Sequence, residues 1–290
     1  MDIAADIKRT FKEGSVLTRL IYINLGVFVV VKLFHVILFL AGQPFSLVDW
    51  LAVPSGINEL IAKPWTIITY MFLHEGFLHI LFNILGLYWF GKLFLYHFEG
   101  EKLLSVYLLG GISGAFIYVI AFNTFPAFES MRSLMLGASA SVFAILVAVA
   151  VYDPDREIHL FFVGGIALKY VAGFYVLLSI LSISSSNPGG NVAHIGGAAW
   201  GWFYIYQLRR GKDLGAGIVT IIDKLEQLFK PRKRMKVSFK QPPPRDDYEY
   251  NKQKNLQQEE INRILEKIAK SGYESLTKKE KEILFKQGKK

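Results

Sequence analysis

The chain has 290 residues, of which 52% are hydrophobic and 14% aromatic, and its mean hydropathy is +0.32. Soluble domains of this size rarely average hydrophobic, so the composition favours a membrane protein. There is no cysteine, which excludes disulfides, thiolate metal sites and cysteine catalysis. The net charge of +9 gathers at the ends, with four Lys and Arg in residues 1–19, seven in 20–208 and 22 in 209–290. Basic residues that flank an apolar body mark the cytoplasmic side of a membrane protein, so we expect a lipid bilayer and no nucleic acid as partner.

Six apolar segments approach the roughly 20 residues that a helix needs to cross a bilayer. They cover residues 20–40, 77–95, 103–122, 139–152, 160–180 and 193–208. We therefore expect an all-α membrane protein, a bundle of six transmembrane helices. Two basic ends on one side of the membrane require an even number of spans, and six satisfies this. The first segment is too long for a signal peptide and no cleavage site follows it, which favours a permanent anchor.

The fourth segment, Ser139 to Tyr152, is unusually short. Its 14 residues make only about 21 Å of helix at 1.5 Å per residue. We expect Ser139 to begin a helix below the outer membrane surface, after backbone that dips inwards. Such backbone is tolerated at membrane depth only where protein or a water-filled cavity covers it, which points to a functional site.

Three reactive side chains lie near the starts of the second, fourth and sixth segments, and all three of these segments begin at the expected outer face. They are His79, Ser139 and His194. Ionisable residues inside membrane spans are costly and are functional candidates by default. The pattern therefore predicts a site at similar depth near the outer leaflet. Lys32, His35 and Lys169 are expected to snorkel or to face other helices.

The residues around His79 and Ser139 favour a catalytic site. His79 and Asn83 stand at i and i+4 and share one helix face, so two donors can point at one spot. Gly137 and small residues surround Ser139 at a helix start, where free N–H groups and the helix dipole favour a developing oxyanion.

The residues around His194 favour close packing. His194 precedes Gly196 and Gly197, and Gly197 with Gly201 forms a Gly-x-x-x-Gly motif. Such spacing lets two helix backbones approach closely in lipid. A hydrogen bond between Ser139 and His194 needs such an approach of the fourth and sixth helices.

With these motifs in this order, the chain resembles the rhomboid intramembrane serine proteases. The resemblance covers about residues 15–210 and implies a Ser–His dyad, with Ser139 as nucleophile and His194 as base. It implies that His79, Asn83 and the Ser139 N–H bind the oxyanion, that Phe143 lies beneath the histidine and that Gly137 supports the serine. It also implies single-span membrane proteins as substrates and no cofactor.

Three positions depart from the family pattern. Ala140 follows the serine where glycine is more usual, Thr66 follows Trp65 where the family has arginine, and Leu95 stands near a position that is often glutamate. None of these changes removes a catalytic atom.

Several alternatives compete with the protease hypothesis. The chain could be an inactive rhomboid-like protein that binds client transmembrane helices without cutting them, although such relatives typically lose the serine or the histidine. Ser141 is an alternative nucleophile. His74 is expected to be structural and to hold the first outer loop. The spacing of His74-Glu75 and His79 is one residue longer than His-Glu-x-x-His, which puts the histidines about 140° apart on a helix and disfavours zinc.

The sequence divides into four regions. We expect residues 1–19 to form a cytosolic N-terminal segment, 209–246 a basic amphipathic segment with a Pro-rich linker, and 247–290 a cytosolic helical hairpin. The resemblance implies that residues 20–208 form a rhomboid protease domain. Residues 255–270 have the apolar spacing of an amphipathic helix, and Thr277 with Glu280 forms a capping box. We expect a multi-pass protein of the bacterial inner membrane with both termini cytoplasmic. The sequence indicates no oligomeric state.

Overall fold

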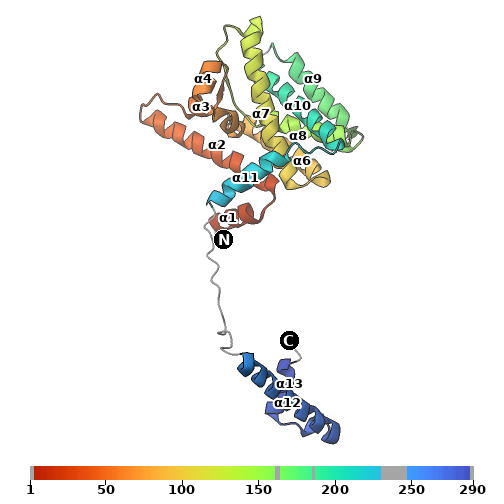
Figure 1. Ribbon diagram of the computed structural model, residues 1–290. Coiled ribbons are helices and arrows are strands. Elements are labelled where there is room, and N and C mark those ends of the chain that lie inside the picture. The colour runs from red at the N-terminus through yellow and green to blue at the C-terminus, as the bar shows by residue number, and fades with distance from the viewer. Residues whose placement is uncertain (1–2, 161–163, 185–186, 230–246, 288–290) are drawn as a thin grey trace. The chain divides into compact units, whose positions relative to one another are not determined.

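The computed structural model describes residues 3–160, 164–184, 187–229 and 247–287, and the chain divides into two compact units, Met1–Lys230 and Pro231–Lys290 (Figure 1). The first unit is a helical bundle with short strands in its loops. Its longer helices are α1 (Ile3–Glu13), α2 (Val16–Leu40), α6 (Phe77–His97), α7 (Gly100–Thr124), α8 (Ser139–Tyr152), α9 (Leu168–Leu181), α10 (Pro188–Arg209) and α11 (Ala216–Phe229).

The six expected spans correspond to α2, α6, α7, α8, α9 and α10, so the predicted all-α membrane bundle is confirmed. Helices α2, α6 and α7 are long and apolar enough to cross a membrane by length and composition. Helices α8 and α9 are apolar but have only 14 residues each. Helix α8 has the predicted bounds, Ser139 and Tyr152, while the depth of Ser139 below the membrane surface stays a prediction.

The fifth span differs from its prediction. Residues 160–180 were expected to be one helix, but α9 begins at Leu168. Before it, β3 (Glu157–Leu160) pairs antiparallel with β4 (Gly164–Ala167), while residues 161–163 lie outside the described part of the chain. Two adjacent glycines at 164 and 165 disfavour a helix, and Gly164 has a φ of +87°, which glycine adopts readily.

The sixth span begins earlier than predicted. Helix α10 starts at Pro188 rather than near residue 193. The side chain of Asn187 accepts a hydrogen bond from the Gly190 N–H, and proline fits the first helical position because it needs no N–H partner there. This early start puts His194 in the second turn of the helix.

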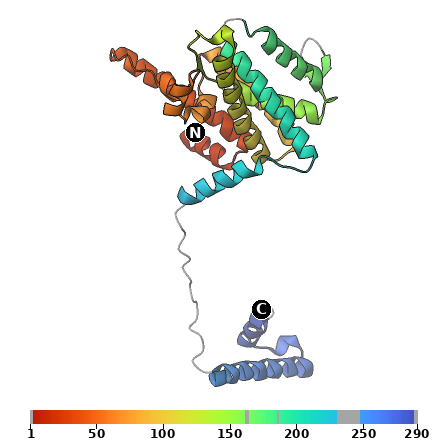
Figure 2. The same cartoon turned by 45° about the horizontal axis from the view of Figure 1, so that its top comes forward.

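Helix α8 forms the centre of the bundle. Ten of its 14 residues are buried, and it contacts α6, α7, α9 and α10. Figures 1 and 2 show α10 running beside α8 and α7, and α9 lying at the edge of the bundle. A Cβ on Gly197 would lie 2.0 Å from the Ala140 carbonyl oxygen, and one on Gly201 would lie 2.2 Å from that of Ala144. The Gly-x-x-x-Gly motif therefore brings α10 against the α8 backbone, as the sequence predicted.

The long loop between α2 and α6 is folded. It contains α3 (Leu47–Leu51), α4 (Ile57–Ala62), α5 (Thr66–Thr69) and the 3₁₀ helix η1 (Tyr70–Phe72). The indole rings of Trp50 and Trp65 stack at 6.4 Å, and the Trp65 Nε1–H donates to the Trp50 carbonyl.

A two-residue sheet joins this loop to the segment that leads to Ser139. Strand β1 (Val53–Pro54) pairs antiparallel with β2 (Leu134–Met135), which follows α7 and the 3₁₀ helix η2 (Pro126–Phe128). The Ser55 N–H also donates to the Ser133 carbonyl. These bonds fix the backbone that enters α8.

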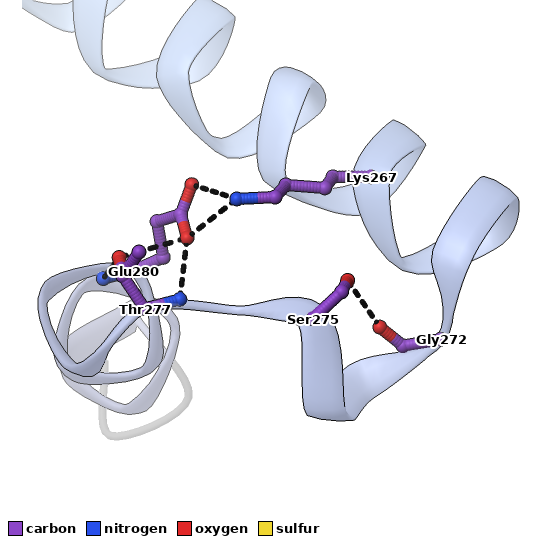
Figure 3. A network of polar contacts seen from close by, with 5 residues as sticks. All are labelled: Lys267, Gly272, Ser275, Thr277 and Glu280. Atoms are coloured by element: carbon purple, nitrogen blue, oxygen red, sulfur yellow. Dashed lines mark hydrogen bonds and ion pairs between the residues drawn. The ribbon is translucent and has the colours of Figure 1, made fainter.

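The second unit contains α12 (Asp247–Ser271), the 3₁₀ helix η3 (Tyr273–Ser275) and α13 (Lys278–Gln287). Helix α12 begins eight residues before the predicted start at residue 255. The predicted capping box is present, since the Glu280 carboxylate accepts from the Thr277 N–H at 2.7 Å and the Glu280 N–H donates to the Thr277 hydroxyl (Figure 3). Lys267 of α12 binds the same carboxylate at 3.0 Å. The basic cluster at 232–236 and the prolines at 242–244 lie outside the described residues.

Candidate active site

Ser139 is the first residue of α8, directly after a turn that only glycine fits easily. Gly137 has a φ of +125°, and its N–H donates to the Tyr70 carbonyl at 2.9 Å. Ala138, between Gly137 and Ser139, has helical φ and ψ. Its carbonyl accepts the first helical hydrogen bond, from the Val142 N–H. The backbone N–H groups of the first helical turn have no acceptor within the helix and can bind a negatively charged oxygen.

The imidazole of His194 lies directly against Ser139. His194 Nε2 and Ser139 Oγ are 2.7 Å apart, a hydrogen bond between residues separated by 55 positions in the sequence. This distance is within the range for a nucleophile and its base. The structure thus brings together the two residues that the resemblance proposed as a dyad.

The His194 ring is held on its face and on its other nitrogen. Phe143 of α8 stacks on it with ring centroids 4.3 Å apart and planes 9° apart. The Phe143 ring meets the edge of Tyr175 from α9 at 6.2 Å. The Nδ1 atom of His194 lies 3.2 Å from the hydroxyl of Ser179, which is also on α9. Phe143 therefore lies where the resemblance put it, whereas no motif in the sequence pointed to Ser179.

His79 reaches the same place from the first turn of α6. A Cβ built on Gly137 would lie 2.8 Å from His79 Nε2 and 3.8 Å from Ser139 Oγ. The Nδ1 atom of His79 accepts the Glu75 N–H at 3.4 Å, so the proton of a neutral ring is on Nε2. An N–H donor of α6 thus faces the small gap beside the serine hydroxyl.

Asn83 is buried one turn further along α6. Its side-chain amide donates to the His79 carbonyl at 2.8 Å, which uses one of its two N–H groups. His74 is also buried and meets the edge of the His79 ring at 5.1 Å. His74 therefore packs against the site histidine, and its expected role of holding the loop stays a prediction.

A cavity of about 660 Å³ opens on the His79 side of the site. Its described lining comes from the turn before α6 and the first turn of α6, from β2 and the residue after it, and from the start of α10. It includes Glu75, Phe77, Met135, Leu136 and Asn187. The lining is mixed in polarity, with Glu75 and Asn187 beside the apolar Phe77 and Leu136.

The departures from the family pattern have local explanations. A Cβ on Gly114 of α7 would lie 2.6 Å from the Ala140 methyl group, so this methyl fills space that glycine leaves on the neighbouring helix. Thr66 is buried and its hydroxyl donates to the Lys63 carbonyl at 2.7 Å. Leu95 packs against the main hydrophobic core.

Other polar residues of the bundle take different positions. Among the described residues, the buried hydroxyl of Ser141 has no hydrogen-bond partner, whereas Ser139 contacts the histidine. Lys32 of α2 donates to the Glu75 carbonyl and Lys169 of α9 pairs with Asp155. The exposed side chain of His35 lies on α2.

A comparison with known families identifies the family of the bundle. A family model for the Rhomboid domain matches residues 62–211, which is just over half of the chain. The chain belongs to the rhomboid family. The match begins within α4 and ends just after α10, so it contains every site residue described above, while α2 lies before it.

Two rhomboid relatives are similar over part of their length. RHOMBOID-like protein 12, mitochondrial, from Arabidopsis thaliana is 28% identical over 211 residues, which are 69% of this chain and 60% of that protein. Presenilin-associated rhomboid-like protein A, mitochondrial, from Danio rerio is 27% identical over 143 residues, 46% of this chain and 35% of that protein. The matches thus span less than two thirds of either relative. Their mitochondrial names do not fit the bacterial inner membrane expected from the sequence.

A second family model matches the second unit. A family of unknown function (DUF6576) matches residues 246–290, which contain α12 and α13. This rhomboid therefore carries an additional helical segment after its membrane bundle.

Proposed function

We propose that this rhomboid is a serine endopeptidase that hydrolyses peptide bonds in or near transmembrane segments of other membrane proteins. The observation that carries the proposal is the 2.7 Å contact between His194 Nε2 and Ser139 Oγ at the start of α8. A serine hydroxyl is a weak nucleophile until an adjacent base takes its proton, and this pair supplies both groups.

The proposed reaction proceeds in two halves. Ser139 Oγ attacks the scissile carbonyl carbon while its proton passes to His194 Nε2. The carbonyl oxygen becomes an oxyanion, which the His79 Nε2–H and the N–H groups at the start of α8 bind. The tetrahedral intermediate collapses, and His194 gives its proton to the leaving amine. Water then attacks the acyl-enzyme by the same route and releases the second product.

The membrane setting supports membrane-protein substrates. Ser139 begins a short helix that packs against α6, α7, α9 and α10, so a soluble protein would have to enter the bundle to reach it. A cavity of about 660 Å³ beside His79 offers room for a short unwound peptide. We propose single-span proteins as the substrate class. We also propose that both ends of this chain lie on the same side of the membrane.

The competing function is binding of client transmembrane helices without cleavage. The names of the relatives are compatible with either function. The presence of both Ser139 and His194, in hydrogen-bond contact, favours cleavage.

The test is cleavage of a fluorogenic single-span substrate by the purified chain in liposomes. Wild-type protein should cut it, and Ser139→Ala and His194→Ala should each lose activity by at least about 10³-fold. The nearby Ser141→Ala should keep the wild-type rate, because Ser141 does not contact the histidine. Cleavage that persists in Ser139→Ala would refute the nucleophile. No cleavage by wild type of several substrates that an active rhomboid cuts would favour the binding function.

A further inference from the structure

A second hydroxyl lies on the far side of His194. Ser179 is on α9, and its Oγ is 3.2 Å from His194 Nδ1, the nitrogen that does not face Ser139. The same Oγ lies 3.0 Å from the Tyr175 carbonyl oxygen, one helical turn earlier. Both distances are within the hydrogen-bonding range. The atoms thus form a continuous row from the α9 backbone through the imidazole to Ser139.

The direction of these bonds follows from the number of protons available. A serine hydroxyl has one O–H, and a backbone carbonyl can only accept, so the Ser179 O–H belongs to the Tyr175 carbonyl. One of the two lone pairs on Ser179 Oγ then faces His194 Nδ1, and this contact is favourable only if Nδ1 carries a proton. A neutral imidazole with its proton on Nδ1 has a free lone pair on Nε2. That lone pair is the one that must accept the Ser139 proton.

We propose that Ser179 is a positioning residue that holds His194 in the tautomer required of a general base, making a Ser139–His194–Ser179 relay. This proposal rests on the proposed protease function. In serine proteases with three linked residues, a carboxylate opposite Nδ1 fixes the tautomer and stabilises the imidazolium. Here a neutral hydroxyl takes this position, with its own orientation set by the Tyr175 carbonyl.

The positions of the buried residues on α9 support this role. The helix has 14 residues, but only Leu168, Ala172 and Ser179 are buried, and Ser179 is 4% exposed. Leu168 and Ala172 are small or apolar packing residues, as expected for the face that touches the bundle. A buried hydroxyl on this face loses its contact with water, so it needs partners there, and it finds them in the histidine and the carbonyl.

The same helix also supports the ring of His194 indirectly. The Tyr175 side chain packs edge-on against Phe143, and Phe143 stacks on His194. One turn of α9 thus fixes the imidazole in two ways, by a hydrogen bond at Nδ1 and through the ring beneath it. If α9 moved away from α8 and α10, His194 would lose its hydrogen bond at Nδ1 and Phe143 would lose its contact with Tyr175.

The kinetic test compares three variants of the full chain in liposomes with a single-span substrate. Ser179→Ala should lower kcat about tenfold with little change in KM, because substrate binding does not involve Nδ1. Ser179→Thr should recover to within about twofold of wild type, since a threonine hydroxyl in a helix can also bond the carbonyl one turn earlier. Ser105→Ala is the matched control, because Ser105 is another buried serine bonded to a carbonyl four residues before it, and it should match wild type.

Two kinetic results would overturn the proposal. One is a wild-type kcat in Ser179→Ala. The other is a threonine variant as slow as the alanine variant, with both showing the thermal unfolding midpoint of wild type. A purely structural role for Ser179 would lower the midpoint, and it would not separate kcat from KM.

A spectroscopic test does not depend on turnover. The chain has six histidines, so ¹⁵N-histidine NMR of the protein in bilayers, assigned by comparison with His194→Gln, can read the His194 tautomer. Wild type should carry its proton on Nδ1, and Ser179→Ala should show a mixture of both tautomers. A proton on Nε2 in wild type, or an unchanged ratio in Ser179→Ala, would refute the relay. If wild type cleaves nothing, the proposed function fails, and this measurement still decides the role of Ser179.

Discussion

The side chain of Lys32 in α2 donates a hydrogen bond to the backbone carbonyl of Glu75, 43 residues later in the chain. Glu75 lies in the turn before α6, and its N–H in turn donates to Nδ1 of His79. A lysine in the first membrane helix is therefore linked, through one residue, to the histidine that faces Ser139. Snorkelling or contact with a neighbouring helix was expected for Lys32, and its actual partner is the backbone of this turn.

Replacing Lys32 should impair catalysis more than substrate binding. In Lys32→Met the turn at Glu75 loses its anchor, and the His79 tautomer and position become less defined. Removing one oxyanion donor outright lowers kcat about 10²–10³-fold. Loosening one should therefore lower kcat about tenfold. Lys63→Met is the control, because Lys63 also donates to a backbone carbonyl, that of Asp49, away from the site. Equal kcat values for the two variants would mean that Lys32 has no such role.

Adding a methyl group at Gly137 should abolish activity. The residue has a φ of +125°, which side-chain-bearing residues rarely adopt, and the new Cβ would lie 2.8 Å from His79 Nε2. We expect Gly137→Ala to cut cleavage at least about 10²-fold, because the methyl group occupies the gap where the oxyanion must sit. Gly173→Ala on α9 is the matched control, since a Cβ there meets no atom within 4 Å and Gly173 does not have a positive φ. Appreciable cleavage by Gly137→Ala would place the oxyanion site elsewhere.

Much of the bundle was predictable because membrane helices need long apolar runs. The bounds of α8 follow directly from the sequence, where glycine precedes the run and Asp153 ends it. The predicted start of the fifth span was wrong, because an apolar run that contains glycines is compatible with a strand or a helix. The bond between Ser179 and His194 could not be predicted, because it depends on how α9 is rotated against α10. The hydrogen bond from Lys32 to the Glu75 carbonyl could not be predicted either, because it depends on the path of the loop between them.

Close packing of α10 on α8 should dominate the stability of the bundle. In Gly201→Ala the new Cβ would lie 2.2 Å from the Ala144 carbonyl oxygen, so the two helices would have to separate. Overpacking of this kind typically costs about 1–3 kcal/mol, and we expect a clearly lower thermal unfolding midpoint in detergent. Gly26→Ala on α2 has open space around its Cβ and should leave the midpoint unchanged or raise it slightly. An unchanged midpoint in Gly201→Ala would show that the interface is more adaptable than its geometry indicates.

The hairpin of α12 and α13 should depend on the ionised form of Glu280. The Thr277 N–H, the Thr277 hydroxyl and Lys267 all donate to its carboxylate, and the backbone bond is the largest cause that lowers its pKa from 4.5 to about 2 (Figure 3). A pKa that is lower in the folded state stabilises the fold above the unfolded value. This stabilisation is therefore fully present above about pH 4.5 and is lost as the pH falls towards 2.

Neutralising the side chain should reproduce this loss at neutral pH. In Glu280→Gln the capping box and the contact with Lys267 are weakened, so the first turn of α13 should open more often. Hydrogen–deuterium exchange of the full chain at pH 7 should show faster exchange in Lys278–Gln287 and unchanged exchange in α8. Glu282→Gln is the control, because it removes a carboxylate from the same helix without touching the capping box. Identical exchange in the two variants would mean that packing between the helices, and not the Glu280 contacts, holds α13 in place.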